Sequence, residues 1–146
     1  MIHKTNSDKE TKAFAVKVAG MVSELKNKRA VVISLKGDLG AGKTVFSKGF
    51  LSAFGIKKVL SPTFVVMKRY NLKGSEFKHL YHFDCYRLGS PEELEVLKIK
   101  DILSDPENIV LMEWPEKAGK YGRGKNIIIN HGKTENERLI KTNLVI

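Results

Sequence analysis

The fold of this chain is decided by the stretch Gly37-Asp38-Leu39-Gly40-Ala41-Gly42-Lys43-Thr44, which fits the phosphate-loop pattern of a glycine, four residues and then Gly-Lys-Thr. The apolar run Val31-Val32-Ile33-Ser34-Leu35 before it predicts a buried strand, and residues 43–54 after it are predicted to form a helix. Glycines let backbone N–H groups turn toward phosphates, and a helix N-terminus adds partial positive charge at the same point. The stretch therefore predicts binding of a nucleoside triphosphate.

The loop residues have individual expected roles. Lys43 is expected to reach the β- and γ-phosphates and to serve catalysis, and the Thr44 hydroxyl is expected to ligate Mg²⁺. Neither Asn-Lys-x-Asp, which would read guanine, nor Asp-x-x-Gly occurs in the chain, so the expected nucleotide is ATP. Nucleotide contacts are expected from the loop and the start of its helix, namely Asp38, Leu39, Gly40, Ala41, Gly42, Lys43, Thr44 and Val45.

The bulk composition is that of ordinary globular protein. The chain has 146 residues, 42% of them hydrophobic and 29% charged, which predicts a single domain over residues 1–146. No apolar stretch approaches the roughly 20 residues of a membrane span, and the first residues lack the apolar segment of a signal peptide, so we expect a cytoplasmic protein. The single cysteine, Cys85, excludes an internal disulfide and is expected to be a small core residue.

The chain is strongly basic, with 26 lysines and arginines against 16 acidic residues and a formal net charge of +10. Such an excess is compatible with a nucleic-acid partner, with a Lys-rich genome and equally with an acidic protein partner. The basic residues are spread along the chain, and no basic stretch interleaved with aromatic residues indicates a stacking platform for RNA. Charge alone therefore leaves direct RNA contact open.

Helices and strands alternate over the rest of the chain. Ser7 starts a capping box, and apolar residues then recur at helical spacing up to Leu25, which predicts an amphipathic helix ending near Asn27. Further strands are predicted at residues 64–70, 77–83, 109–112, 126–130 and 138–146, the first two as a β-hairpin, and a short helix is predicted at residues 91–97. This order indicates an α/β fold, a three-layer P-loop NTPase with a central mixed, mostly parallel sheet, an antiparallel hairpin and edge strands.

Two carboxylates follow predicted strands. Glu113 comes directly after the apolar run Ile109-Val110-Leu111-Met112, at the end of a parallel strand where such sheets bind ligands, and is the expected second partner of Mg²⁺. Asp84 follows the second strand of the hairpin and is expected to serve catalysis by positioning water or the hydration shell of the metal. Thr63 lies in a loop after a proline, where its hydroxyl is a candidate for approaching the γ-phosphate or the metal.

Ordinary structural roles are open for the same kinds of residue. Glu113 could be solvated or paired with a lysine, and Asp84 could pair with Arg87 or cap a turn. His82 is expected to be a satisfied histidine of the sheet, and Trp114 to pack in the core or to anchor a nucleotide or a partner.

Five motifs in series resemble one family. They are the phosphate loop, Ser61-Pro62-Thr63-Phe64, His82-Phe83-Asp84-Cys85-Tyr86-Arg87-Leu88, Pro91-Glu92-Glu93-Leu94 and Glu113-Trp114-Pro115. Their order and spacing are similar to those of the TsaE family, the bacterial ATPases of tRNA threonylcarbamoyladenosine biosynthesis. The resemblance runs from about Thr11 to Pro115 and fades after it, which leaves any contribution of the C-terminal strands and of Arg138 undetermined.

The resemblance implies a small Mg²⁺-dependent ATPase that does not itself transfer the carbamoyl group. It would act with the proteins TsaD and TsaB, which install threonylcarbamoyl on adenosine 37 of tRNA, and its ATP hydrolysis would support turnover of that complex. Whether tRNA touches this chain is not implied. The resemblance assigns Mg²⁺ to Thr44 and Glu113, a catalytic role to Asp84, a switch role to Thr63 and an adenine contact to the region of Thr11.

Two other functions also fit a phosphate loop. A small kinase would need an acceptor pocket and a lid over the phosphates, for which the best candidate is the Gly-rich, basic segment of residues 117–125. A nucleotide-dependent switch or binding module with negligible turnover would need the loop alone.

Overall fold

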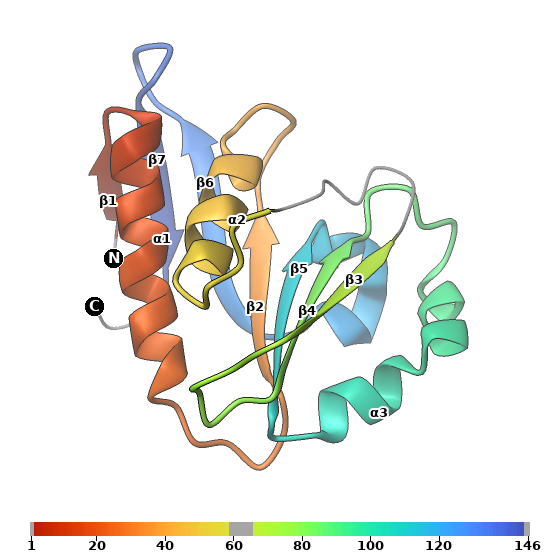
Figure 1. Cartoon of the computed structure of the whole chain (residues 1–146). Coiled ribbons are helices and arrows are strands. Elements are labelled where there is room, and N and C mark those ends of the chain that lie inside the picture. The colour runs from red at the N-terminus through yellow and green to blue at the C-terminus, as the bar shows by residue number, and fades with distance from the viewer. Residues whose placement is uncertain (1, 59–65, 145–146) are drawn as a thin grey trace.

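The computed structural model describes residues 2–58 and 66–144. Thr63, the expected switch residue, lies outside the described residues, as does the first part of the predicted strand at residues 64–70. Within the described residues the chain forms a seven-stranded sheet in the order β1-β7-β6-β2-β5-β4-β3 (Figure 1).

The strands and helices of this part of the chain alternate much as predicted. The strands are β1 (Ile2–Thr5), β2 (Val31–Lys36), β3 (Met67–Asn71), β4 (His79–Asp84), β5 (Asn108–Glu113), β6 (Lys125–His131) and β7 (Arg138–Thr142). The helices are α1 (Asp8–Ser23), α2 (Lys43–Ser52), α3 (Ile99–Ser104) and the 3-10 helices η1 (Pro91–Leu97) and η2 (Pro115–Gly122).

The centre of the sheet is parallel and its borders are antiparallel. β2 pairs in parallel with both β5 and β6, and β5 pairs in parallel with β4. β3 is antiparallel to β4, β7 to β6, and β1 to β7. The predicted mixed α/β fold, with a mostly parallel centre, an antiparallel hairpin and antiparallel edge strands, is confirmed.

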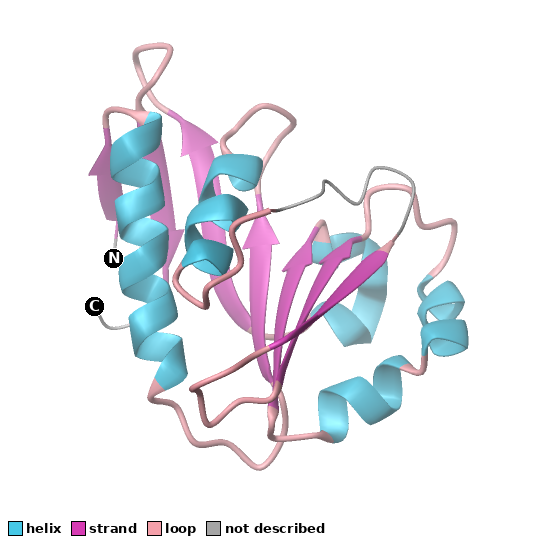
Figure 2. Ribbon diagram, in the orientation of Figure 1, coloured by secondary structure: helices cyan, strands magenta, loops and turns pink. Residues whose placement is uncertain are grey.

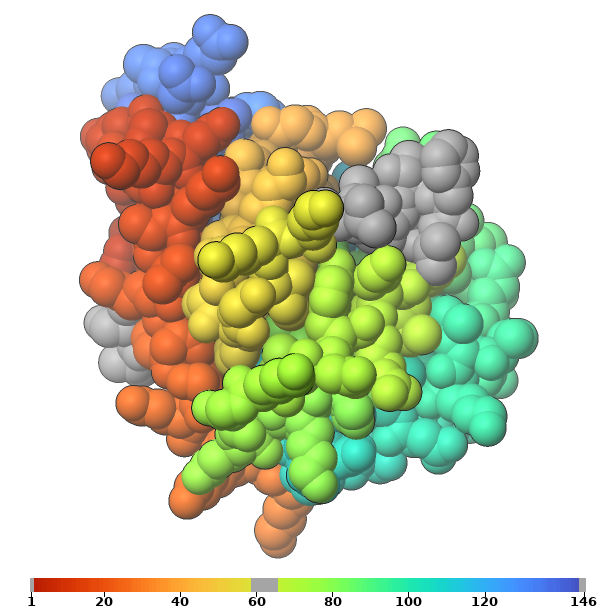
Figure 3. All heavy atoms as spheres, viewed as in Figure 1, coloured from red at the N-terminus to blue at the C-terminus, as the bar shows by residue number. Residues whose placement is uncertain are grey.

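Helices cover both faces of the sheet (Figure 2). α1 and α2 pack on one face, where Phe14 and Phe46 belong to the same apolar cluster as Ile33 of β2. These two helices and the β3–β4 hairpin form the central part of the surface seen in Figure 3, beside the teal region of η1 and α3. η1, α3 and η2 cover the opposite face, where Leu94 clusters with Met112 of β5. All six residues of β5 are buried, as expected for a central parallel strand enclosed between two helical layers.

The ends of α1 show how local chemistry sets an element. Ser7 is its N-cap and accepts a hydrogen bond from the backbone N–H of Glu10, which confirms the predicted capping box. The helix ends at Ser23 rather than near Asn27, the predicted end. Leu25 packs against the core from a turn after the helix, so the apolar periodicity of the sequence extends beyond the last helical residue.

Some elements carry too little local signal to be predicted. β1 and α3 span four and six residues, and β1 is ordered by pairing with β7 at the sheet edge. η2 is interrupted at Gly119, where φ is +55°. β7 ends at Thr142, where the predicted strand continues, and Leu144 donates its N–H to the Thr142 hydroxyl; residues 145–146 lie outside the described residues. In the described part of the chain, no helix has both the length and the apolar character needed to cross a membrane.

Candidate functional site

The phosphate-loop stretch joins the end of β2 to the start of α2. Its backbone adopts conformations that favour glycine, with φ at +76° for Gly40 and +104° for Gly42. A side chain at Gly37 would collide with β6, because its Cβ would lie 2.5 Å from the backbone oxygen of Ile129. Gly42 is the N-cap of α2, and no described side chain caps this helix end, so its first N–H groups are available to an anion.

The other loop residues differ in exposure. Asp38 and Leu39 are exposed, whereas Ala41 is buried in the apolar cluster under α1 and α2. The N–H of Ala41 donates to the carbonyl of Asp38 at 3.1 Å, so that donor is used within the loop. Thr44 is exposed in the first turn of α2, and Val45 is half-buried behind it. Their nucleotide contacts stay predictions.

Lys43 is held inside the loop, with 6% of its surface exposed. Its Nζ donates a hydrogen bond to the backbone carbonyl of Gly37 and lies 3.5 Å from the centroid of the Trp114 ring. Burial lowers the pKa of Lys43, and the negative charge of Glu113 is the strongest influence in the opposite direction. The site therefore contains a partly desolvated cation whose present contacts, a carbonyl and an aromatic face, are replaceable by phosphate oxygens.

The two predicted carboxylates lie at the same edge of the sheet as the loop. Asp84 and Glu113 are register partners at the carboxyl ends of the neighbouring parallel strands β4 and β5. Glu113 is also in register with Leu35, two residues before the loop begins at Gly37. Neighbouring strands lie about 4.8 Å apart, so Glu113 is one strand and Asp84 two strands from β2, and both charges act on Lys43 of the loop. Their predicted positions at strand ends are confirmed.

His82 forms a buried pair with Glu113. The His82 Nε2 atom and the Glu113 Oε2 atom are 2.6 Å apart, and the two side chains are 2% and 9% exposed. Glu113 makes no ion pair with a lysine among residues 2–58 and 66–144, and it is not solvated, so neither alternative for this residue holds. His82 Nδ1 is buried without a described partner. The histidine thus orients a carboxylate of the site, beyond the purely structural role that the sequence favours.

Asp84 combines a structural contact with an unusual charge environment. Its Oδ1 atom accepts a hydrogen bond from the backbone N–H of Tyr86 at 3.1 Å, so the alternative of capping a turn holds for one oxygen. Burial raises the pKa of Asp84, and the charge of Glu113 adds to that increase, although the bond from Tyr86 opposes it. The next residue, Cys85, is fully buried in the core as predicted, and burial raises the pKa of its thiol to about 12.

Mg²⁺ fits these residues when nucleotide phosphates complete its coordination. No described group of three or more His, Cys, Asp and Glu side chains could hold a metal ion by itself. Mg²⁺ is usually bound in nucleotide sites by one or two carboxylates together with substrate phosphates, and by the Thr hydroxyl of a phosphate loop. Glu113, Asp84 and Thr44 provide these groups.

Thr11 and Arg138 lie on the β1–β7 side of the loop. The Thr11 hydroxyl is buried 2.7 Å from that of Thr5, and Thr5 is in register with Arg138. A Cβ on Gly42 would lie 3.3 Å from the Arg138 Nε atom, which is buried without a hydrogen-bond partner among the described residues. The guanidinium is fixed by Nη1, which donates to two backbone carbonyls of the preceding turn at 2.6 and 2.9 Å. Arg138 thus borders the loop, and the adenine contact near Thr11 stays a prediction.

The contacts that Trp114 makes with Lys43 and Tyr86 are not predicted from the sequence. Trp114 has a left-handed backbone, with φ at +55°, and its ring lies under Lys43 and 5.0 Å from the ring of Tyr86. The sequence does contain a signal that places His82 at the site. His82 precedes Asp84 by two residues, and residues two apart in a strand lie on the same face. No local pattern signals Arg138.

The candidate lid has a different structure. Most of residues 117–125 belong to η2, in which Ala118 and Tyr121 are buried against the sheet. The segment is therefore packed as a layer of the fold, and the structure gives the kinase alternative no free lid in this place.

Comparison with known proteins agrees with this geometry. The family model described as threonylcarbamoyl adenosine biosynthesis protein TsaE matches residues 5–140. The chain belongs to the TsaE family. The TsaE match continues well past Pro115, so the expectation that the resemblance fades there is wrong. β6, which pairs with the loop-bearing β2 and with β7, lies in the matched region, and the match ends within β7.

Individual TsaE relatives cover most of the chain. The tRNA threonylcarbamoyladenosine biosynthesis protein TsaE of Haemophilus influenzae is 40% identical over 118 residues, which are 80% of this chain and 72% of that protein. The protein of the same name in Bacillus subtilis is 38% identical over 112 residues, 76% of this chain and 64% of that protein. The crystal structure of Bacillus subtilis YdiB matches with a TM-score of 0.73 and 30% identity, covering 97% of this chain and 83% of that one. TsaE proteins take part in tRNA threonylcarbamoyladenosine biosynthesis.

Proposed function

We propose that this chain is a Mg²⁺-dependent ATPase, an accessory subunit that acts with TsaD and TsaB in the threonylcarbamoyl modification of adenosine 37 in tRNA. The observation that carries the proposal is the register pairing of Asp84 with Glu113 beside the phosphate loop. A loop alone binds phosphates, whereas hydrolysis also needs a metal-binding carboxylate and a group that orients water. Both kinds of group lie here beside one buried lysine, Lys43.

The loop and its neighbours would bind the triphosphate. Lys43 would exchange its contacts with the Gly37 carbonyl and the Trp114 ring for phosphate oxygens, which carry negative charge whereas the carbonyl and the ring are neutral. The N–H groups at the start of α2 would add donors from the backbone. Arg138 contributes positive charge beside Gly42, with its Nε atom still available.

The carboxylates would divide the remaining work. Thr44 and Glu113 would hold Mg²⁺, which supplies charge neutralisation on the phosphate oxygens when bound. His82 would keep Glu113 in one orientation, because a buried bond to Oε2 fixes the carboxylate. Asp84 would accept a hydrogen bond from the attacking water, and a raised pKa makes a carboxylate a stronger acceptor for that proton. The bond that forms joins the water oxygen to the γ-phosphorus, and the bond to ADP breaks.

Trp114, the only tryptophan of the chain, offers a direct test. Because Lys43 Nζ lies 3.5 Å from the Trp114 ring, ATP binding that moves Lys43 should change the tryptophan fluorescence. Lys43→Ala should abolish both the ATP-dependent part of that change and hydrolysis. Free phosphate should be released without a phosphorylated acceptor, and its rate should rise when TsaD, TsaB and tRNA are added.

Three results would contradict the proposal. A phosphorylated small acceptor would make the chain a kinase. ATP binding with no hydrolysis, even with the partners present, would leave only a nucleotide-dependent switch. Failure to associate with TsaD and TsaB would remove the accessory role.

A further inference from the structure

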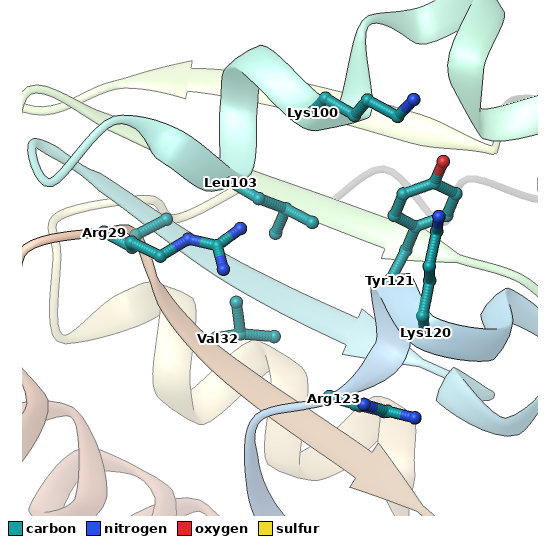
Figure 4. A pocket seen from close by; sticks show the side chains of 8 residues that line it. Arg29, Val32, Lys100, Leu103, Lys120, Tyr121 and Arg123 are labelled. Atoms are coloured by element: carbon teal, nitrogen blue, oxygen red, sulfur yellow. The ribbon is translucent and has the colours of Figure 1, made fainter.

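A second cavity, of about 460 Å³, lies at the opposite end of β2 from the phosphate loop (Figure 4). Its floor is apolar, formed by Ala30, Val32 and Leu103. Val32 precedes Gly37 by five residues, which at about 3.3 Å per residue of strand separates this floor from the loop by roughly 17 Å. The cavity is therefore distinct from the nucleotide site, and its volume lies within the usual range of about 300–1,000 Å³ for ligand pockets.

The polar lining of this cavity is entirely basic apart from one tyrosine. Arg29 enters from the segment before β2, Lys100 from α3, and Lys120 and Arg123 from the end of η2 (Figure 4). All four are exposed. They come from three separate regions of the sequence, which is why no basic run announces the site. We refer to Arg29, Lys100, Lys120 and Arg123 as the basic cavity.

Three of these four cations make no ion pair with a described carboxylate. Within the described residues, Arg29, Lys120 and Arg123 make no ion pair, and Lys100 has one long contact, 3.8 Å from Nζ to Glu95 Oε1. That glutamate oxygen already accepts a hydrogen bond from Tyr121 at 2.7 Å. Glu95 is the acidic group that acts on Lys100 and Lys120, so the four cations outnumber the described carboxylates beside them and repel one another. An anionic ligand would stabilise the arrangement.

We propose that the basic cavity binds the sugar–phosphate backbone of tRNA. Guanidinium groups match phosphate oxygens in a bidentate geometry, two lysines add point charge, and the apolar floor can receive the sugar or base edge of one nucleotide. The described lining contains no carboxylate and would attract any polyanion, and RNA is favoured over an acidic protein because the family acts in tRNA modification. This inference rests on the proposed role in tRNA modification but not on ATP hydrolysis, because the two sites are separate.

The test measures binding of a labelled, unmodified tRNA transcript by fluorescence anisotropy. Arg29→Gln/Arg123→Gln should weaken binding about tenfold and reduce the slope of log affinity against log salt by one to two between about 50 and 200 mM. The matched control is Lys57→Gln/Lys58→Gln, which removes the same charge from a different cavity, of about 410 Å³. The tRNA affinity of the control variant should stay within about twofold of that of the chain without substitutions. Arg29→Lys/Arg123→Lys should keep the salt slope, because the charge remains.

Several outcomes would overturn the inference. If the control variant loses as much tRNA affinity as Arg29→Gln/Arg123→Gln, the tRNA is attracted diffusely to a basic surface. If Arg29→Lys/Arg123→Lys loses as much, the contacts with tRNA do not depend on charge. Displacement of tRNA by polyglutamate at equal charge concentration would indicate an acidic protein as the partner. Trp114 fluorescence with ATP should be unchanged in every variant, which shows that they fold. Hydrolysis without RNA binding would refute this inference alone, and RNA binding without hydrolysis would refute only the proposed ATPase.

Discussion

The buried pair of His82 and Glu113 yields a quantitative prediction. Their 2.6 Å contact is almost fully shielded from water, so replacing either partner by leucine leaves the other polar group without its bond. Loss of a hydrogen bond to a charged group, with a buried group left unsatisfied, costs about 1–3 kcal/mol. We therefore expect Glu113→Leu and His82→Leu each to lower the free energy of unfolding by about 2 kcal/mol, or Tm by about 6–7 °C for a chain of this length.

The double variant separates this pair from ordinary packing. When both partners become apolar, no buried group is left unpaired, and such replacements are often nearly neutral. His82→Leu/Glu113→Leu should therefore be more stable than either single variant, with a coupling energy of about 2 kcal/mol or more. Urea unfolding of the four chains, without Mg²⁺ and nucleotide, measures that coupling. Additive effects within about 0.5 kcal/mol would refute the reasoning.

A functional readout on the same chains distinguishes the roles of the two residues. ATP titrations followed by Trp114 fluorescence should lose their Mg²⁺ dependence in both variants that lack Glu113. His82→Leu should keep that dependence but require about 10–100-fold more Mg²⁺, since its effect is to orient the ligand. Unchanged Mg²⁺ dependence without Glu113 would reject the metal assignment, whatever the stability data show.

Two further predictions concern charge and backbone. The pKa of Asp84 is raised in the folded chain, so the folded state binds its proton more tightly than the unfolded state does. Protonated Asp84 therefore adds to the stability of the fold below the ordinary pKa of 3.8, and this stabilisation is lost as the pH rises through the folded pKa. Asp84→Asn should therefore raise Tm at pH 7 but not below about pH 3.5, which thermal melts at the two pH values measure. The same variant should hydrolyse ATP more slowly, which phosphate release measures. Gly20→Ala in α1 should stabilise the chain by about 0.5–1 kcal/mol, because a Cβ there meets nothing within 4 Å. In contrast, Gly122→Ala should cost about 3 kcal/mol or more in urea unfolding, because its Cβ would lie 2.1 Å from the Pro115 carbonyl. Equal stability of the two alanine variants would contradict the packing of η2.

Some parts of the site follow from sequence because their causes are local. The glycine spacing of the loop fixes a turn that only glycine tolerates, as Gly42 shows with its φ of +104°. Apolar runs of strand length identify β2 and β5, and a carboxylate directly after such a run must lie at a strand end. Asp84 and Glu113 were therefore placed at strand ends without knowledge of the strand order.

The sequence by itself determined the phosphate loop, the strands that lead to it and the two carboxylates at strand ends. Only the tertiary structure decided that β4, β5 and β2 are neighbours, which brings His82 to Glu113 and both carboxylates to Lys43. It also decided that Arg29, Lys100, Lys120 and Arg123 line one cavity. The physical reason is that strand order and helix packing depend on contacts between distant segments, whose apolar patterns are too similar to specify which segments become partners.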